Sequence, residues 1–104
     1  MFDVLELQKQ LVAAACPSGS EYKAISPLLA DLAKPFVDEV YTDAMGNLIC
    51  HKKGSGKKIM LCAHMDAIGL MVTSVSEDGA VWFTNVGGLR PVQMIGARDR
   101  KSVV

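Results

Sequence analysis

The chain has 104 residues, half of them hydrophobic, with eleven basic and eleven acidic side chains and three cysteines. A chain of this length forms one domain at most, and its composition is typical of a globular core rather than of a disordered segment. The balanced charge gives no electrostatic reason to expect nucleic acid or an acidic membrane surface as a partner. No apolar stretch is long enough to span a membrane, and the pattern after Met1 leads us to expect no secretory signal. An odd number of cysteines without a CxxC motif favours a reducing compartment, so we expect a cytoplasmic protein.

Two helices are predicted in the first third of the chain. Asp3 is placed to cap the first, which runs up to Cys16. Ser18 or Ser20 is predicted to cap the second, and Pro27 should delay or kink its start. The apolar face of this second helix is formed by Ile25, Leu28, Leu29, Leu32 and Ala33.

Strands joined by turns are predicted for the rest of the chain. The expected strands are residues 36–43, 48–51, 58–64, 69–76 and 81–84, and the expected turns are residues 43–47, 54–56 and 77–79. The strand at 58–64 is continuously apolar from Ile59 to Ala63, which is typical of a parallel strand buried on both faces. Helices followed by strands of this kind predict an α/β fold.

The motif His64-Met65-Asp66 follows that apolar run directly. Side chains at positions i and i+2 of an extended segment point to the same side, so Asp66 can reach the ring of His64. A metal-ligating histidine usually donates its second ring N–H to a carboxylate, and functional groups gather at the carboxyl ends of buried parallel strands. The motif therefore predicts half of a metal site, although a satisfied polar pair at the rim of a sheet has the same pattern.

One histidine cannot hold a catalytic metal alone, since catalytic zinc takes about three protein ligands and a water. Cys62 would face the same side as His64 by strand alternation, but we interpret it as a small buried hydrophobe. His51 lies between Cys50 and Lys52 and is interpreted as facing solvent. A glycoside hydrolase is the least favoured class, because no pair of carboxylates with suitable spacing is visible.

Four segments that follow one another along the chain carry a family resemblance: Ser18-Gly19-Ser20-Glu21, Asp43-x-x-Gly46-Asn47-Leu48, Ala63-His64-Met65-Asp66-x-Ile68-Gly69-Leu70-Met71-Val72 and Val86-Gly87-Gly88. They resemble the N-terminal part of the glutamyl and deblocking aminopeptidases, which are cytoplasmic dinuclear metallopeptidases that assemble into tetrahedral particles and include members labelled endoglucanase. The resemblance covers most of the chain, and the segment around His64 is its most specific part.

The resemblance implies a metal-dependent aminopeptidase that releases N-terminal residues from peptides and forms a homo-oligomer. His64 would be a ligand of one metal of a zinc or cobalt pair, and Asp66 would be the catalytic-site carboxylate that orients it. Residues 1–67 would open the α/β-sandwich catalytic domain of the metallopeptidase. Residues 68–104 would open an inserted, β-barrel-like dimerisation domain and leave it incomplete.

Two departures from the family pattern stand out. Ala67 replaces the usual glutamate, and Asp99-Arg100-Lys101 replaces an expected apolar strand, which suggests truncation. We therefore expect the isolated chain to be inactive until a C-terminal half supplies the missing ligands. Two alternatives stay open: a catalytically inactive module for binding or assembly, and a piece of a domain with no independent role.

Overall fold

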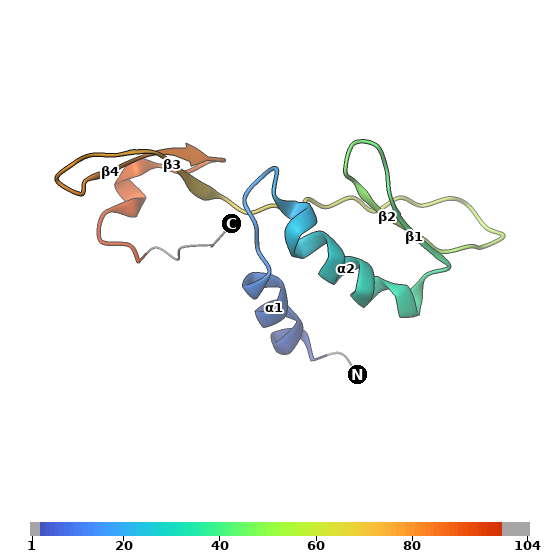
Figure 1. Ribbon diagram of the computed structural model, residues 1–104. Coiled ribbons are helices and arrows are strands. Elements are labelled where there is room, and N and C mark those ends of the chain that lie inside the picture. The colour runs from blue at the N-terminus through green and yellow to red at the C-terminus, as the bar shows by residue number, and fades with distance from the viewer. Residues whose placement is uncertain (1–2, 99–104) are drawn as a thin grey trace. The chain divides into compact units, whose positions relative to one another are not determined.

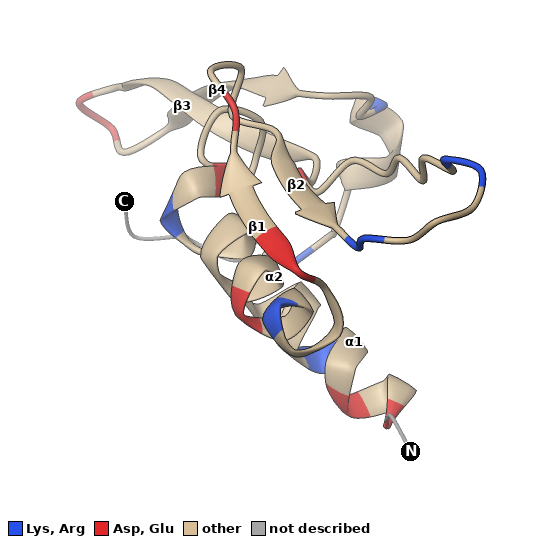
Figure 2. Cartoon of the chain, turned by 90° about the vertical axis from the view of Figure 1, so that its right-hand side faces the viewer, with Lys and Arg blue, Asp and Glu red and all other residues tan. Residues whose placement is uncertain are grey.

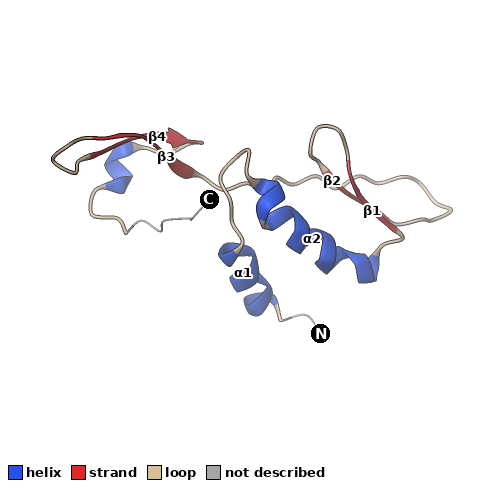
Figure 3. Ribbon diagram, in the orientation of Figure 1, coloured by secondary structure: helices blue, strands red, loops and turns tan. Residues whose placement is uncertain are grey.

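A computed structural model describes residues 3–98, and the chain divides into two compact units, Met1–Ala67 and Ile68–Val104. The first unit contains both α-helices and one β-hairpin, and the second contains another hairpin (Figures 1 and 3). The fold is thus a mixture of helix and strand. None of the helices within residues 3–98 has the length and apolar character needed to cross a membrane.

Helix α1 (Val4–Ala13) begins where the sequence predicts. The carboxylate of Asp3 accepts hydrogen bonds from the backbone N–H groups of Leu5 and Glu6 at 3.0 and 3.1 Å. These bonds satisfy two of the N–H groups that have no partner inside the helix, which confirms the predicted cap. The helix ends at Ala13, short of the predicted Cys16.

Helix α2 (Ile25–Ala33) follows a short 3₁₀ turn at Glu21–Lys23. Pro27 lies in the first helical turn, where its missing N–H breaks no intrahelical bond, so the proline is accommodated by a late helix start. The predicted cap is wrong, because Ala24 precedes the helix and neither Ser18 nor Ser20 caps it with a side chain.

The first hairpin pairs β1 (Glu39–Thr42) with β2 (Leu48–His51) in antiparallel register, with Val40 opposite Cys50. Helix α2 contacts both strands (Figure 1). Its first residue, Ile25, is 4% exposed and is the one buried hydrophobic side chain among residues 3–98. The core of this unit therefore lies where the start of α2 packs.

The turn between these strands is built by Asp43. Its carboxylate accepts from the backbone N–H groups of Met45 and Asn47 and from the Asn47 side-chain amide, each at 2.9 Å. Gly46 has a φ of +86°, a conformation that suits glycine. The predicted turn and return strand are confirmed by these contacts.

The predicted buried strand at residues 58–64 is wrong. This segment is irregular, and Ile59, Met60 and Leu61 are 84–93% exposed. A strand exists only through hydrogen bonds to a neighbour, and the described part of the chain offers this segment no partner strand. Cys62 is exposed for the same reason, so its interpretation as a buried hydrophobe is also wrong.

The second unit is built on β3 (Gly69–Val75) and β4 (Val81–Val86), an antiparallel hairpin with an irregularity between Val72 and Ser74. Its turn lies at the predicted Glu77-Asp78-Gly79. A 3₁₀ helix at Pro91–Met94, which the sequence pattern does not predict, follows β4. The charged and valine residues of positions 99–104 lie outside the described residues.

Candidate functional site

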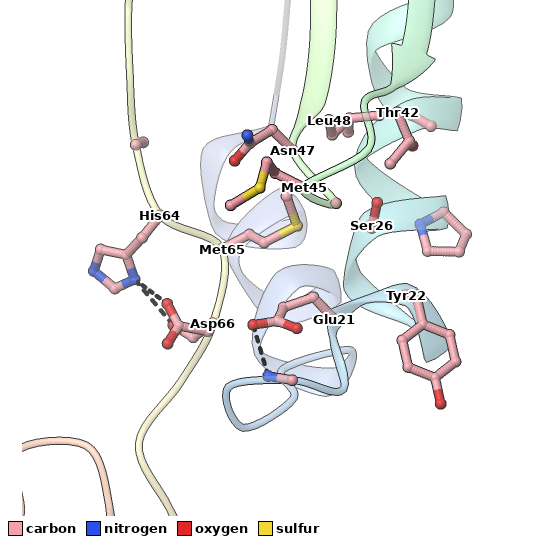
Figure 4. A pocket seen from close by; sticks show the side chains of 15 residues that line it. Glu21, Tyr22, Ser26, Thr42, Met45, Asn47, Leu48, His64, Met65 and Asp66 are labelled. Carbon is pink, nitrogen blue, oxygen red and sulfur yellow. Dashed lines mark hydrogen bonds and ion pairs between the residues drawn. The ribbon is translucent and has the colours of Figure 1, made fainter.

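The structure brings His64 and Asp66 together as the motif predicts. His64 Nδ1 lies 2.8 Å from Asp66 Oδ1 and 3.1 Å from the backbone carbonyl oxygen of Asp66 (Figure 4). A carbonyl oxygen can only accept, so Nδ1 must carry the proton and donate it. The neutral ring is then the Nδ1–H tautomer, and Nε2 keeps a free lone pair that can bind a metal.

The side chains of His64 and Asp66 differ in their exposure to solvent. The side chain of His64 is 86% exposed, whereas that of Asp66 is 32% exposed. Hydrogen bonds lower the pKa of the Asp66 carboxyl below its ordinary value, first the bond from the Ser18 hydroxyl and then the bond from His64. The Asp66 carboxylate is therefore fixed by hydrogen bonds, whereas the His64 side chain is exposed to solvent.

Ser18 is the partner that the sequence pattern missed. Its Oγ donates to Asp66 Oδ2, the carboxylate oxygen that His64 leaves free. The loop carrying Ser18 runs beside the His64 segment, because Ala67 N–H donates to the Cys16 carbonyl at 2.8 Å and Pro17 forms a parallel bridge with Ala67. No local pattern signals this pairing, since it joins residues that are distant in the chain.

An open hollow of about 640 Å³ lies next to this pair in the first unit. Three of the segments that resemble the aminopeptidases border it: the loop before α2, the turn between β1 and β2, and the His64 segment (Figure 4). Glu21 is fixed there, since its Oε1 accepts from Gly19 N–H at 3.0 Å. The residues labelled in the figure are Glu21, Tyr22, Ser26, Thr42, Met45, Asn47, Leu48, His64, Met65 and Asp66.

His51, the second histidine, belongs to a separate cluster of charges on the first hairpin. Its Nδ1 lies 3.2 Å from Glu39 Oε2, and Lys53 Nζ lies 2.9 Å from Glu39 Oε1. Lys53 and His51 lower the pKa of the Glu39 carboxyl, and Glu39 raises the pKa of Lys53. Figure 2 shows acidic colour at the start of β1 and basic residues along the loop that follows β2. His51 is half exposed, in keeping with the predicted solvent-facing position.

The donor set at His64 fits part of a metal site. An imidazole with a free Nε2 and an Nδ1–H held by a carboxylate is the usual arrangement of a metal-ligating histidine. Within residues 3–98, however, no three His, Cys, Asp or Glu side chains lie close enough together to hold a metal ion. Within this set, the His64–Asp66 pair is thus the arrangement that fits one ligand of a metal site together with its orienting carboxylate.

Comparison with known proteins points to one class of enzyme. The sequence profile described as M42 glutamyl aminopeptidase matches residues 46–100. The chain is similar to the lysyl aminopeptidase of Pyrococcus furiosus, with 41% identity over 95 residues that make up 91% of this chain and 28% of that protein. It is also similar to FrvX of Escherichia coli K12, named as an aminopeptidase candidate, with 34% identity over 90% of this chain and 26% of that protein.

A solved structure gives the same result. The fold superposes on an aminopeptidase from the archaeon Desulfurococcus kamchatkensis, APDkam598, with a TM-score of 0.78 and 37% identity, over 86% of this chain and 25% of that chain. The chain therefore spans only 25–28% of the length of these three relatives.

Proposed function

The chain belongs to the M42 glutamyl aminopeptidase family, and on that premise we propose that it supplies part of the active site of a metal-dependent aminopeptidase. The enzyme would release N-terminal residues from peptides. The observation that carries this proposal is the His64–Asp66 pair, with Nδ1 held at 2.8 Å and Nε2 left free. The pair lies beside a hollow bordered by two other family-like segments.

His64 would hold one of two divalent ions, zinc or cobalt, through Nε2. When bound, such an ion lowers the pKa of a water molecule and polarises the scissile carbonyl. Asp66 accepts a hydrogen bond from the Nδ1–H group of His64, which would fix the tautomer and the direction of the ring. Two further polar side chains of the site already form hydrogen bonds. The Ser18 hydroxyl donates to Asp66, and the Glu21 carboxylate accepts from the Gly19 backbone N–H.

The division of the chain supports a matching division of roles. Residues 1–67 would open the catalytic domain, and residues 68–104 would open an inserted β-rich dimerisation domain. The boundary of the two compact units at Ala67 and Ile68, and the hairpin that dominates the second unit, favour this assignment. A peptide substrate, assembly into a homo-oligomer and a cytoplasmic location belong to the same proposal.

A second candidate function is a catalytically inactive module that binds a partner or serves in assembly. It is favoured by the absence of a three-donor metal group within residues 3–98. Ala67 adds to this, since a methyl group can neither ligate a metal nor accept a hydrogen bond. This candidate predicts association without hydrolysis.

A chimeric enzyme tests the proposal. The segment of the Pyrococcus furiosus lysyl aminopeptidase that aligns with this chain is replaced by this chain, and release of N-terminal residues from aminoacyl p-nitroanilides is measured with zinc and with cobalt. We expect metal-dependent activity that His64→Ala abolishes. His51→Ala is the matched control, because His51 also holds a carboxylate through Nδ1 but lies in the separate charge cluster.

The two candidate functions give different outcomes. A folded chimera that binds metal and releases no N-terminal residue would overturn the aminopeptidase proposal and favour the inactive module. Full activity in the His64→Ala chimera would remove His64 from the metal site.

A further inference from the structure

Ser18 occupies a position from which it can control His64 without touching it. We propose that Ser18 is a positioning residue that sets the tautomer and direction of the His64 ring through Asp66. The inference rests on the proposed role of His64 as a metal ligand, and it concerns a residue outside the 46–100 segment that the family profile matches. The chain of contacts is Ser18 hydroxyl, Asp66 carboxylate, His64 imidazole.

The carboxylate of Asp66 is used on both sides. Oδ1 accepts the Nδ1 proton of His64, and Oδ2 accepts the Ser18 hydroxyl proton. A carboxylate held at one oxygen can still rotate about its side-chain torsion, whereas one held at both oxygens has a fixed plane. Because His64 takes its direction from Oδ1, the bond from Ser18 to Oδ2 also restrains the imidazole.

The loop that carries Ser18 is anchored by backbone bonds. Ser20 N–H donates to the Pro17 carbonyl at 3.1 Å, and Ala67 N–H donates to the Cys16 carbonyl at 2.8 Å. The parallel bridge between Pro17 and Ala67 lies on the same side. Backbone hydrogen bonds therefore fix the chain on both sides of Ser18, and this positions its hydroxyl next to Asp66.

The His64 ring, in contrast, has little else to hold it. Its side chain is 86% exposed, and the residues that lead to it, 57–63, are exposed and irregular. Packing therefore restrains the ring weakly, and its direction depends on the two acceptors offered by Asp66. The Asp66 carboxylate therefore connects the anchored Ser18 loop to the exposed His64 ring and restrains the orientation of that ring.

The test measures the ring of His64 in the whole 104-residue chain without metal. Long-range ¹H–¹⁵N correlation spectra of histidine-labelled protein distinguish the Nδ1–H from the Nε2–H tautomer of each neutral ring. The spectra are recorded for the wild type, Ser18→Ala, Ser18→Thr and Ser20→Ala. Ser20 is the matched control, since it lies in the same loop and its side chain caps nothing. His51, held by Glu39, is an internal reference in every spectrum.

We expect Ser18→Ala to lower the Nδ1–H population of His64 severalfold while the His51 signals stay unchanged. Ser18→Thr keeps a hydroxyl and should restore the wild-type tautomer, and Ser20→Ala should leave it unaltered. A folded Ser18→Ala chain with the wild-type His64 tautomer overturns the proposal. If Ser18→Ala unfolds the chain, Ser18→Cys decides, because a thiol is a weak donor of similar size. An unshifted His64 in folded Ser18→Cys also overturns the proposal.

This outcome is independent of the chimera experiment. The tautomer is read without metal, substrate or turnover, so failure of the aminopeptidase proposal leaves the Ser18 result standing. Conversely, a His64 tautomer that does not change in Ser18→Ala would exclude the positioning role of Ser18, but it would not exclude His64 as a metal ligand.

Discussion

The backbone N–H of Ala67 donates a 2.8 Å hydrogen bond to the carbonyl of Cys16. This bond lies at the end of the segment that carries His64 and Asp66, and it joins that segment to the loop between α1 and α2. The loop in turn provides Ser18, which donates to Asp66. Residues that are distant in sequence are thus joined by hydrogen bonds around Asp66. Substitutions in the loop between α1 and α2 should therefore alter the orientation of the His64 ring.

Asp66→Asn should weaken metal binding at His64. An amide replaces one of the two carboxylate oxygens with an NH2 group that only donates, so it cannot accept at both the position facing His64 and the position facing Ser18, whereas the carboxylate does. In the chimeric enzyme we expect zinc affinity to fall about 10- to 100-fold, as is typical when the group orienting a metal ligand is lost. Competition with a chromogenic chelator measures the affinity.

The control for this experiment is Asp31→Asn. Asp31 forms an exposed ion pair with Lys34 at 2.7 Å, a type of contact that contributes little. Zinc affinity should be unchanged in that variant. An equal affinity in Asp66→Asn and the wild type would argue against an orienting role for Asp66.

Asp43→Ala should loosen the first hairpin. The variant loses three hydrogen bonds from Met45 and Asn47 to the Asp43 carboxylate and leaves the turn to Gly46 and the backbone. We expect amide hydrogen exchange at Tyr41 and Ile49, which face each other across the strands, to accelerate severalfold. Asp43→Asn is the control, because asparagine supports the same kind of turn. Unchanged exchange in Asp43→Ala would show that the strands hold the turn, rather than the reverse.

The same turn should respond to acid in a defined range. The pKa of Asp43 lies below its ordinary value of 3.8, chiefly because the Asn47 side chain donates to the carboxylate and the Asn47 backbone N–H adds to it. When the folded-state pKa of a carboxyl is depressed, its ionised form stabilises the fold, and this stabilisation is complete at a pH above the unfolded-state pKa. The stabilisation is lost as the pH falls through the folded-state pKa. The amide chemical shifts of Met45 and Asn47 should therefore stay constant from neutral pH to about 4 and change only in stronger acid. Asp43→Asn should show no such transition, and a change centred above 4 would contradict the prediction.

Gly87→Ala should destabilise the second hairpin more than Gly79→Ala. Both glycines have a φ of +84°, which costs an L-residue about 1–2 kcal/mol. A Cβ at Gly87 would also lie 3.1 Å from Ile68 Cγ2, whereas a Cβ at Gly79 would meet no atom within 4 Å. Urea unfolding followed by the fluorescence of Trp82 on β4 measures the difference. Equal losses of unfolding free energy in the two variants would mean that the Ile68 side chain moves away from the added methyl group without an energetic cost.

Local chemistry accounts for what the sequence predicts well. Asp3 caps α1 because its carboxylate lies next to the N–H groups of residues two and three positions later. The turn at Asp43 and the strand after it follow from bonds within five residues. The contact between His64 and Asp66 likewise needs only the alternation of an extended segment. These features depend on near neighbours, which a sequence pattern records directly.

Contacts with distant residues account for what the sequence did not predict. The apolar residues 59–61 carry a strand pattern, but a strand also needs a hydrogen-bonded neighbour, and residues 3–98 offer none. The bond from Ser18 to Asp66 depends on how the loop before α2 meets residues 66–67. The serine pattern predicts a helix cap, because capping is the commonest local use of a serine before a helix.

Lys57 and Lys58 precede the exposed apolar residues 59–61 directly and are themselves exposed. Extended, uncharged apolar segments promote intermolecular β-pairing, and flanking charges act as gatekeepers against it. By this principle, the two ammonium groups are placed to give protection against intermolecular β-pairing of residues 59–61. Acetylation of both lysines would remove that protection while leaving the His64 pair itself unchanged.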